Sequence, residues 1–333
     1  MLYVSTRNKL DSYTAHRALH EERAPDNGMF VPFHLSAFSQ DDLDKLKEYT
    51  FSENIARILN LFFSKQLSGW DIEFSIGRYP FRIEQLNQRI IVAELWHNTK
   101  HDYAHLIESI YQRLIAAEKQ TTNPPQWAKI AAEVAILFGL YGELQKKGID
   151  SFDIAVSSEN FLYPVSAWYA RQMGLPIHCI ICRCDESGVV WDFLQRGELT
   201  SDSEQVGCLE HLIYGTLGLN CMETCLNAYE SEVSFQLTEE ELQLLNEGFF
   251  AAVVGANRTN AVMNSLYRTN SYITDPITAA SYGALQDYRA RTGENRVTLL
   301  LSRHSPALHA AQIACAIGCS QEKLKAMIHL SRE

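Results

Sequence analysis

Residues 154–184 read IAVSSENFLYPVSAWYARQMGLPIHCIICRC, and this stretch indicates the fold class. A short apolar run at Ile154–Val156 precedes a segment of helical pattern at Pro164–Met173, and a second apolar run follows at Ile177–Cys182. A strand, a helix and a second strand in this order are typical of a parallel sheet with helices packed on it. The stretch therefore predicts an α/β domain.

The flanking sequence extends this pattern in both directions. Further strand-like runs lie at Ile90–Leu95 and Val297–Leu301. Segments of helical pattern lie between and after these runs, at 96–114, Gln126–Leu144, Thr238–Phe250, Thr274–Arg289, Pro306–Ile317 and Gln321–His329. The third of these opens with a Thr-Glu-Glu-Glu cap. We predict an α/β domain with a parallel sheet over residues 86–333.

Residues 1–85 are predicted to form a separate, mostly helical N-terminal unit. A short strand is expected at Leu2–Val4, and helices are expected at Leu10–Glu22, Ser39–Lys47 and Ser52–Phe63. Asp26-Asn27-Gly28 tolerates positive φ angles, so the chain should reverse its direction there.

Composition limits the classes of partner. The chain has 333 residues, of which 46% are hydrophobic, and its formal net charge is −11. An excess of acidic residues argues against a nucleic-acid or anionic-membrane surface, because phosphate contacts require clustered Lys and Arg. Neither a basic segment followed by an apolar run at the N-terminus nor an apolar run of roughly 18 residues is found. We therefore expect a cytoplasmic protein without nucleic-acid or membrane partners.

Six segments, in one order, resemble the threonine synthase family of pyridoxal-phosphate (PLP) enzymes, whose fold the tryptophan synthase β subunit shares. They are MLYVSTRN, RAPDNGMFVP, AELWHNTKHDYAHLIESIYQRL, IAVSSENFLYPVSAWYARQMGLPI, YITDPITAASYGAL and LLLSRHSPAL. The third is similar to the family's ELFHGPTxAFKDFGxxxL, the fourth to AVPTGNFGxxxAGYYAxxMGLPI, and the last two to DPHTAVG and TAHPAKF. The resemblance implies the threonine synthase fold.

The resemblance also implies a lysine that holds PLP as a Schiff base. When the third segment is aligned without a gap, His97 and Arg113 match the family, and Ala104 stands where the lysine should be. Lys100 is four residues upstream, about 6 Å along a helix. We expect Lys100 to be a solvated residue in the first turn of that helix, and the alternative is a displaced Schiff-base lysine.

A second departure concerns the glycine-rich loop that holds the PLP phosphate in the family. TGNFG is replaced here by Ser158-Glu159-Asn160-Phe161-Leu162, so both glycines are lost and Glu159 places a carboxylate where the phosphate should sit. The structural alternative is that Ser157 or Ser158 caps the following helix, with Glu159 in its first turn. Both interpretations argue against phosphate binding.

A third departure is a predicted deletion. The family carries a further α/β subdomain of roughly 100 residues, domain-sized, before the helix that Gln126–Leu144 resembles. The chain crosses this gap near residues 119–126 with QTTNPP, so the family's SGDTG segment is missing. Ile277 also replaces the histidine of DPHTA.

Three places in the sequence could carry a chemistry that replaces that of PLP. His97, His101 and His105 recur every four residues, so His101 and His105 could share a metal, with Glu94 and Glu108 as the nearest further ligands. Cys179, Cys182 and Cys184 also have metal-like spacing, but on a strand Cys179 faces away from the other two, which favours core cysteines. Ser302 and His304 are an unselective serine–histidine pair.

We therefore interpret the chain as a catalytically degenerate, threonine-synthase-like protein that needs no cofactor. A cleft between the two units is expected to hold an amino-acid-like ligand. Alternatively, the face that the deletion exposes is expected to bind a second copy or another protein. The predicted vestigial pocket consists of His97, His101, Asp102, His105, Glu159, Asn160, Phe161, Ser302 and His304. The alternative is an active enzyme, either a PLP-dependent lyase using Lys100 or a metal-dependent enzyme using His101 and His105.

Overall fold

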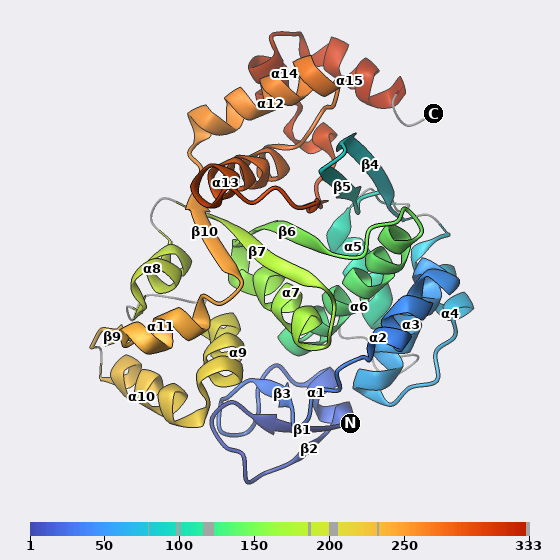
Figure 1. Cartoon of the computed structure of the whole chain (residues 1–333). Helices are drawn as coiled ribbons and strands as arrows, with labels where there is room; N and C mark the ends of the chain where they lie inside the picture. Colours follow the sequence, from blue (N-terminus) through green and yellow to red (C-terminus); the bar gives the residue numbers. More distant parts are fainter. Residues whose placement is uncertain are drawn as a thin grey trace.

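The computed structural model describes residues 1–78, 80–97, 100, 102–115, 123–185, 188–199, 206–231 and 233–330. A six-stranded sheet of order β10-β7-β6-β11-β5-β4 forms its centre (Figure 1). Its strands are β4 (Arg82–Asn87), β5 (Ile90–Glu94), β6 (Phe152–Ser157), β7 (Ile177–Cys184), β10 (Phe249–Val253) and β11 (Thr298–Ser302). All neighbouring strands run parallel except β4, which pairs antiparallel with β5 at one edge. The predicted α/β fold is confirmed, but the sheet is mixed rather than purely parallel.

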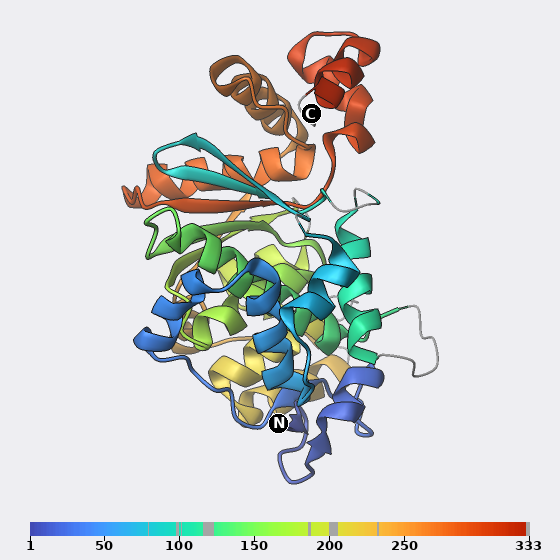
Figure 2. The same cartoon turned by 90° about the vertical axis from the view of Figure 1, so that its right-hand side faces the viewer.

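Helices cover both faces of this sheet (Figures 1 and 2). On one face, α13 contacts four strands, and three further helices pack behind it. The helices of this face are α12 (Ala256–Asn270), α13 (Pro276–Thr292), α14 (Ala310–Ile317) and α15 (Gln321–Leu330), with a 3-10 turn at Pro306–His309. On the other face lie α6 (Gln126–Gln145) and α7 (Leu162–Gln172), preceded by a 3-10 turn at Glu159–Phe161.

Helix α6 is the centre of the second layer. It contacts α3 (Phe51–Phe63) on one side and α7 on the other, so its 20 residues are buried almost all round. A helix packed on all sides needs no polar face, which explains why its sequence is mostly apolar. Pro125 precedes its first residue, where a missing N–H costs nothing. The predicted helix Gln126–Leu144 is thereby confirmed.

The N-terminal unit contains more strand than predicted. Strands β1 (Leu2–Ser5), β2 (Tyr13–Thr14) and β3 (Phe30–Pro32) form an antiparallel sheet beside α1 (Ala15–His20). The helix expected at Leu10–Glu22 is therefore shorter, because the residues before Ala15 are used to pair with β1. Asn27 has a φ of 65°, as the turn prediction requires. The unit also contains α2 (Gln40–Asp44), a 3-10 turn at Lys45–Glu48, α3 and α4 (Gly69–Ile76).

Two sequence predictions were wrong at element boundaries. The helix expected over 96–114 is α5 (Tyr103–Ile115), and it begins at Tyr103 because the Asp102 carboxylate accepts the Ala104 N–H at 2.9 Å. Lys100 therefore lies in a turn before the helix rather than in its first turn. The helix expected over 238–250 ends at Leu245 as α11 (Glu239–Leu245), because Gly248 turns the chain with a φ of +81° into β10.

The remaining elements lie beyond the β10 edge of the sheet. They are α8 (Val189–Arg196), β8 (Glu198–Leu199), α9 (Val206–Leu217), α10 (Leu219–Glu230), β9 (Phe235–Gln236) and α11. Helix α9 is joined to the N-terminal unit by Glu210, whose buried carboxylate accepts the Thr6 hydroxyl at 2.8 Å and pairs with Arg7 and Arg23 at 3.4 Å. Within the described part of the chain, no helix is long and apolar enough to cross a membrane.

His211 on α9 should make the protein sensitive to acid. Its ring is fully buried, its Nδ1 lies 3.0 Å from the Tyr169 hydroxyl oxygen, and the ring stacks on Trp127. Burial, with a smaller contribution from Arg23, lowers the pKa of His211 from 6.5 to about 3. Between these pH values the unfolded chain binds a proton that the folded chain excludes, so stability is lost as the pH falls.

We expect His211 alone to lower the free energy of unfolding by up to about 1.4 kcal/mol per pH unit in this window. Urea unfolding of the wild type and of His211→Gln at several pH values measures the slope. Identical slopes in the two proteins would contradict this account.

Candidate functional site

The polar residues of the candidate site lie where two neighbouring parallel strands end. Ser302, the last residue of β11, is level with Glu94, the last residue of β5. Arg303 directly follows β11, and His97 lies three residues after β5. In open α/β sheets ligands bind beyond the carboxyl ends of the strands, so this edge is the expected place for a site.

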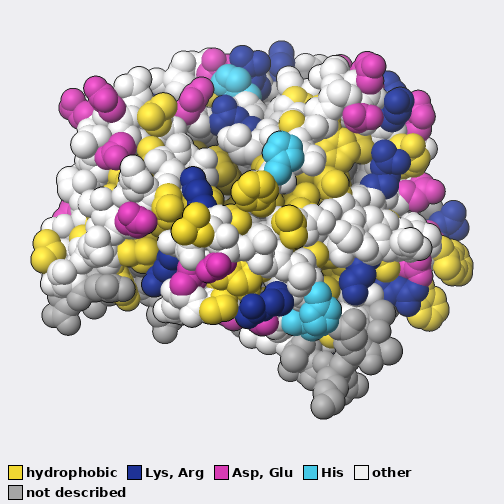
Figure 3. Space-filling view, turned by 90° about the horizontal axis from the view of Figure 1, so that it is seen from below, with side chains coloured by type: hydrophobic (Ala, Val, Ile, Leu, Met, Phe, Trp, Pro, Cys, Tyr) yellow, Lys and Arg dark blue, Asp and Glu magenta, His cyan; other side chains and the backbone are white. Residues whose placement is uncertain are grey.

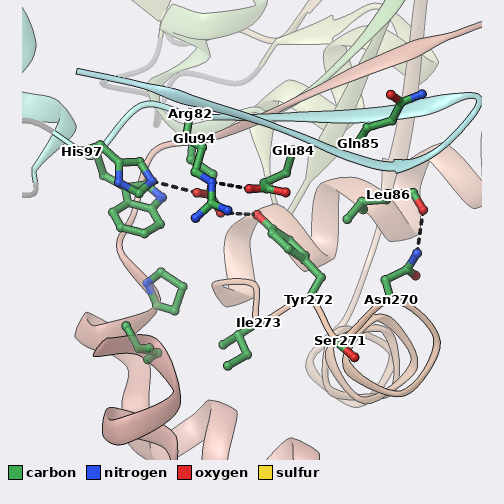
Figure 4. Close-up of a pocket in the computed structure, with 13 residues that line it drawn as sticks. Arg82, Glu84, Gln85, Leu86, Glu94, His97, Asn270, Ser271, Tyr272 and Ile273 are labelled. Carbon is green, nitrogen blue, oxygen red and sulfur yellow. Dashed lines mark hydrogen bonds and ion pairs between the residues drawn. The ribbon is translucent and has the colours of Figure 1, made fainter. Parts of the chain in front are cut away.

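Glu94 is the centre of a hydrogen-bonded chain of three side chains (Figure 4). One of its carboxylate oxygens accepts the Tyr272 hydroxyl at 2.8 Å, and the other lies 2.7 Å from Nε2 of His97. The His97 ring stacks on Trp96, with the ring centroids 4.0 Å apart. Glu94 is only 6% exposed, so these two contacts supply much of what the carboxylate loses by leaving water.

These residues line a cavity of about 220 Å³ between the β4–β5 hairpin and the segment that joins α12 to α13. Figure 4 shows Tyr272 and His97 approaching Glu94 from two sides of it. The further lining combines charged and apolar groups: Arg82, Glu84, Leu86, Trp96, Asn270, Ile273, Pro306 and Ile328. Arg82 and Glu84, two residues apart on β4, form an ion pair.

Tyr272 acts as a hydrogen-bond donor in this chain. Burial, followed by the neighbouring Glu94 carboxylate, raises the pKa of Tyr272 well above its ordinary value of 10. The hydroxyl therefore keeps its proton over the physiological pH range and donates a hydrogen bond to Glu94.

The Ser302 hydroxyl makes structural hydrogen bonds to two buried side chains. Its hydroxyl donates to the Asp275 carboxylate at 3.1 Å and accepts from the Trp96 indole N–H at 3.3 Å. Asp275 is fully buried and also accepts the backbone N–H groups of Ile277 and Thr278 at the start of α13. Ser302 thus bonds to Asp275 and Trp96, whereas His304 forms a backbone bridge with Asp102.

A second polar cluster lies on the other side of the β11 carboxyl end. The Arg303 guanidinium lies 3.3 Å from the ring centroid of Tyr163 and 5.3 Å from that of Tyr103. Its Nη2 is 3.8 Å from the carboxylate of Glu133 on α6, and both residues are at most 5% exposed. Burial raises the pKa of the Glu133 carboxyl while Arg303 opposes it, and burial raises the pKa of Tyr163 to about 12.

In the loop after β6, the predicted capping bond is made by Ser157 and not by Ser158, at the 3-10 turn that precedes α7. Ser158 makes no capping bond through its side chain, whereas the Ser157 hydroxyl accepts the Glu159 N–H at 3.4 Å. Phe161 has a φ of 50° and is fully buried, so it anchors the start of α7 in the core. The side chain of Asn160 lies outside the described residues.

Lys100 and His105 line another part of the surface. With Phe74, Glu108 and Arg113 they border a groove of about 490 Å³ between α4 and α5. Lys100 is exposed, and burial, followed by Lys100, lowers the pKa of His105. Ala104, at the predicted lysine position, is also exposed.

The predicted vestigial pocket is thus distributed over several places. His97 lines the Glu94 cavity, His105 lines the α4–α5 groove, Phe161 is in the core, and Asp102 caps α5. His101 lies outside the described residues, so the proposed His101–His105 metal pair stays a prediction. Among the residues that the structure describes, no group of three or more His, Cys, Asp or Glu could hold a metal ion.

The prediction for the cysteine run is confirmed. Cys182 and Cys184 pack in the core formed with α6 and α7, whereas Cys179 packs on the opposite face with residues of α13. All three thiols are free and buried.

Sequence reasoning missed Tyr272, Asp275, Glu133 and Arg303 as members of these clusters. Local signals existed for Asp275, which precedes Pro276 and so marks the start of a helix, and for Arg303, which directly follows a buried strand at the edge where ligands bind. Tyr272 and Glu133 belong to elements far from β5 and β11 in the sequence, so no local pattern could have paired them.

The surface seen from below mixes charges of both signs with patches of hydrophobic side chains (Figure 3). Trp70 and Phe74, four residues apart on α4, are 72% and 79% exposed. The expected homodimer or protein partner stays a prediction, as does the missing subdomain, because residues 116–122 lie outside the described part.

Comparison with known proteins points to one family. Residues 2–78 match the family model described as "Threonine synthase N terminus". Human "Threonine synthase-like 1" is 27% identical over 181 residues, which are 48% of this chain and 24% of that protein. "Threonine synthase-like 2" of Xenopus laevis is 27% identical over 124 residues, covering 34% and 26% of the two chains. The matches thus span about a quarter of the length of these relatives.

Solved threonine synthases have the same fold. The yeast enzyme superposes with a TM-score of 0.81 at 15% identity, over 97% of this chain and 91% of that one. The PLP-bound enzyme of Brucella melitensis gives a TM-score of 0.80 at 16% identity, over 96% and 91%. At these identities the likeness shows the fold alone.

Removing the Tyr272 hydroxyl should measure how much the cavity depends on its hydrogen bond. We expect Tyr272→Phe to lower the free energy of unfolding by about 1.5–3 kcal/mol, because a buried carboxylate loses a donor. Tyr229→Phe is the matched control, since Tyr229 is 43% exposed. Equal urea midpoints for the two variants would show that the Glu94 contact contributes nothing.

Proposed function

We propose that this chain is a threonine-synthase-like protein that binds a small amino-acid-like molecule in the Glu94 cavity without using PLP. The proposal rests on the chemistry of the cavity wall and on the residues at the position where the family's cofactor is expected. Its single most important support is Glu94.

Glu94 is a carboxylate that is held nearly out of water yet faces a cavity. Keeping a charge at such a place costs free energy, and Tyr272 and His97 fix both of its oxygens in position. A preorganised carboxylate beside an open volume is suited to an ammonium group, which can donate a further hydrogen bond to it.

The rest of the cavity suits the remainder of an amino acid. The Arg82 guanidinium can pair with a carboxylate in two-pronged geometry, at the same rim as Glu84. Trp96, Ile273 and Pro306 offer apolar contact to a short side chain. The volume of about 220 Å³ is below the roughly 300–1,000 Å³ of sites for drug-sized ligands, so the ligand is small.

PLP does not fit the residues at the expected cofactor position. A methyl group stands at Ala104, and it cannot form a Schiff base. Glu159 follows β6 where the family has a loop that holds a phosphate, and its charge opposes a dianion. Lys100 is exposed in the α4–α5 groove, which the Glu94 cavity does not share.

A panel of L-amino acids, screened by thermal shift and then by calorimetry, tests the ligand. We expect at least one amino acid to stabilise the wild type. Glu94→Gln should weaken the binding of that amino acid about tenfold, or 1.4 kcal/mol, because the side chain that faces the ammonium group loses its charge. Glu108→Gln is the control, since Glu108 lines the other groove. The proposal fails if no amino acid binds, or if both variants bind equally.

Treatment with PLP tests the cofactor separately. The protein is incubated with PLP, its visible spectrum is recorded, and any Schiff base is reduced with borohydride and mapped by peptide mass spectrometry. We expect no stoichiometric adduct at a single lysine, with Lys146→Ala as a surface control. A stoichiometric adduct at Lys100 that Lys100→Ala removes would make the chain a PLP enzyme with a relocated lysine.

A further inference from the structure

We propose that the Arg303 side chain fills the place that the cofactor takes in the threonine synthase family. The guanidinium would then be an internal replacement for the cofactor, held by Glu133 and by the rings of Tyr103 and Tyr163. This inference goes beyond the proposed ligand site, because Arg303 does not line the Glu94 cavity.

The position of Arg303 is the first support. Two segments that the resemblance links to the cofactor meet here with a third segment of the resemblance, which carries Arg303 itself. Tyr103 is the neighbour of Ala104, Tyr163 directly follows the loop that replaces TGNFG, and Arg303 itself lies in the segment similar to TAHPAKF. The meeting point is the carboxyl end of β11, where ligands of α/β sheets bind.

The packing of Arg303 is the second support. Its flat guanidinium lies 3.3 Å from the centroid of the Tyr163 ring, which is stacking distance. Arg303 is 5% exposed, so the space between α5, α6 and α7 at this strand end is occupied by the chain itself. A planar group on an aromatic ring also resembles, in shape, a bound heteroaromatic ring.

The charge balance of the cluster is the third support. Glu133 on α6 is 1% exposed and lies 3.8 Å from Arg303, so the two opposite charges are buried together. Arg303 Nε, Glu133 Oε1 and the Tyr103 hydroxyl are buried without a hydrogen-bond partner. If Arg303 were truncated, Glu133 and Tyr103 would remain as ready acceptors for a guanidinium from solution.

Chemical rescue tests whether Arg303 occupies a discrete space. Arg303→Ala should melt at a lower temperature than the wild type, and ethylguanidinium should raise its midpoint. Arg258→Ala is the control, because Arg258 pairs with Asp287 at the surface and is 39% exposed. The proposal is overturned if Arg303→Ala is as stable as the wild type, or if ethylguanidinium has the same effect on both variants.

If Arg303→Ala does not fold, Arg303 and Glu133 are both replaced, in a double variant that combines Arg303→Met with Glu133→Gln. Removing both charges avoids an unpaired carboxylate, so this double variant should be more stable than Arg303→Met alone. A double variant that is no more stable than Arg303→Met would show that Glu133 does not hold Arg303, and would reject the arrangement.

A gain-of-function experiment tests the place itself. Ala104→Lys restores the residue that the family uses, and PLP labelling at position 104 is then measured by borohydride reduction and peptide mass spectrometry. We expect several-fold more labelling when Ala104→Lys is combined with Arg303→Met and Glu133→Gln than in Ala104→Lys alone. Equal labelling would show that Arg303 does not occupy the cofactor's place. The PLP labelling of the wild type, which tests the proposed function, uses none of these variants. Its outcome is therefore independent of the comparison between the Ala104→Lys variants.

Discussion

The covering of both faces of the central sheet is the constraint on which the rest of the structure depends. With α13 on one face and α6 and α7 on the other, strands β5, β6 and β11 have no solvated side, and most of their residues are apolar. Polar chemistry is therefore confined to the strand ends. Glu94, Ser302 and Arg303 all lie at the carboxyl ends of β5 and β11, and each needs a partner from another element.

Two buried carboxylates obtain their partners in different ways, and they differ in whether a small molecule can reach them. Glu94 is bonded by Tyr272 and His97 but keeps an open volume beside it. Glu133, by contrast, is enclosed with Arg303 between aromatic rings. One carboxylate is thus available to a small molecule and the other is neutralised internally, although their clusters flank the same strand end.

Local patterns predicted the local structure well. The strand–helix–strand unit over 152–184 and helix α6 were read correctly, because apolar runs and proline positions are short-range signals. Strand β10 was missed because its five residues directly follow a helical pattern, and β4 was missed because an exposed edge strand lacks an apolar run. The start of α5 was misplaced because Asp102, rather than the spacing of apolar residues, determines it.

The site depends on pairings between distant segments, such as Tyr272 with Glu94, which no local pattern contains. The absence of PLP chemistry stays a prediction from Ala104 and Glu159.

The carboxylate of Glu210 has a consequence for the order of assembly. It bonds to Thr6, Arg7 and Arg23, so the first strand of the chain depends on a residue about two hundred positions later. During synthesis the N-terminal segment emerges first but cannot satisfy these polar groups until α9 has been made. Contacts over such sequence distances slow folding, since a long loop must close before they contribute. The polar contacts of Thr6, Arg7 and Arg23 therefore form only after strands β4 to β7, which precede Glu210 in the chain, have been synthesised.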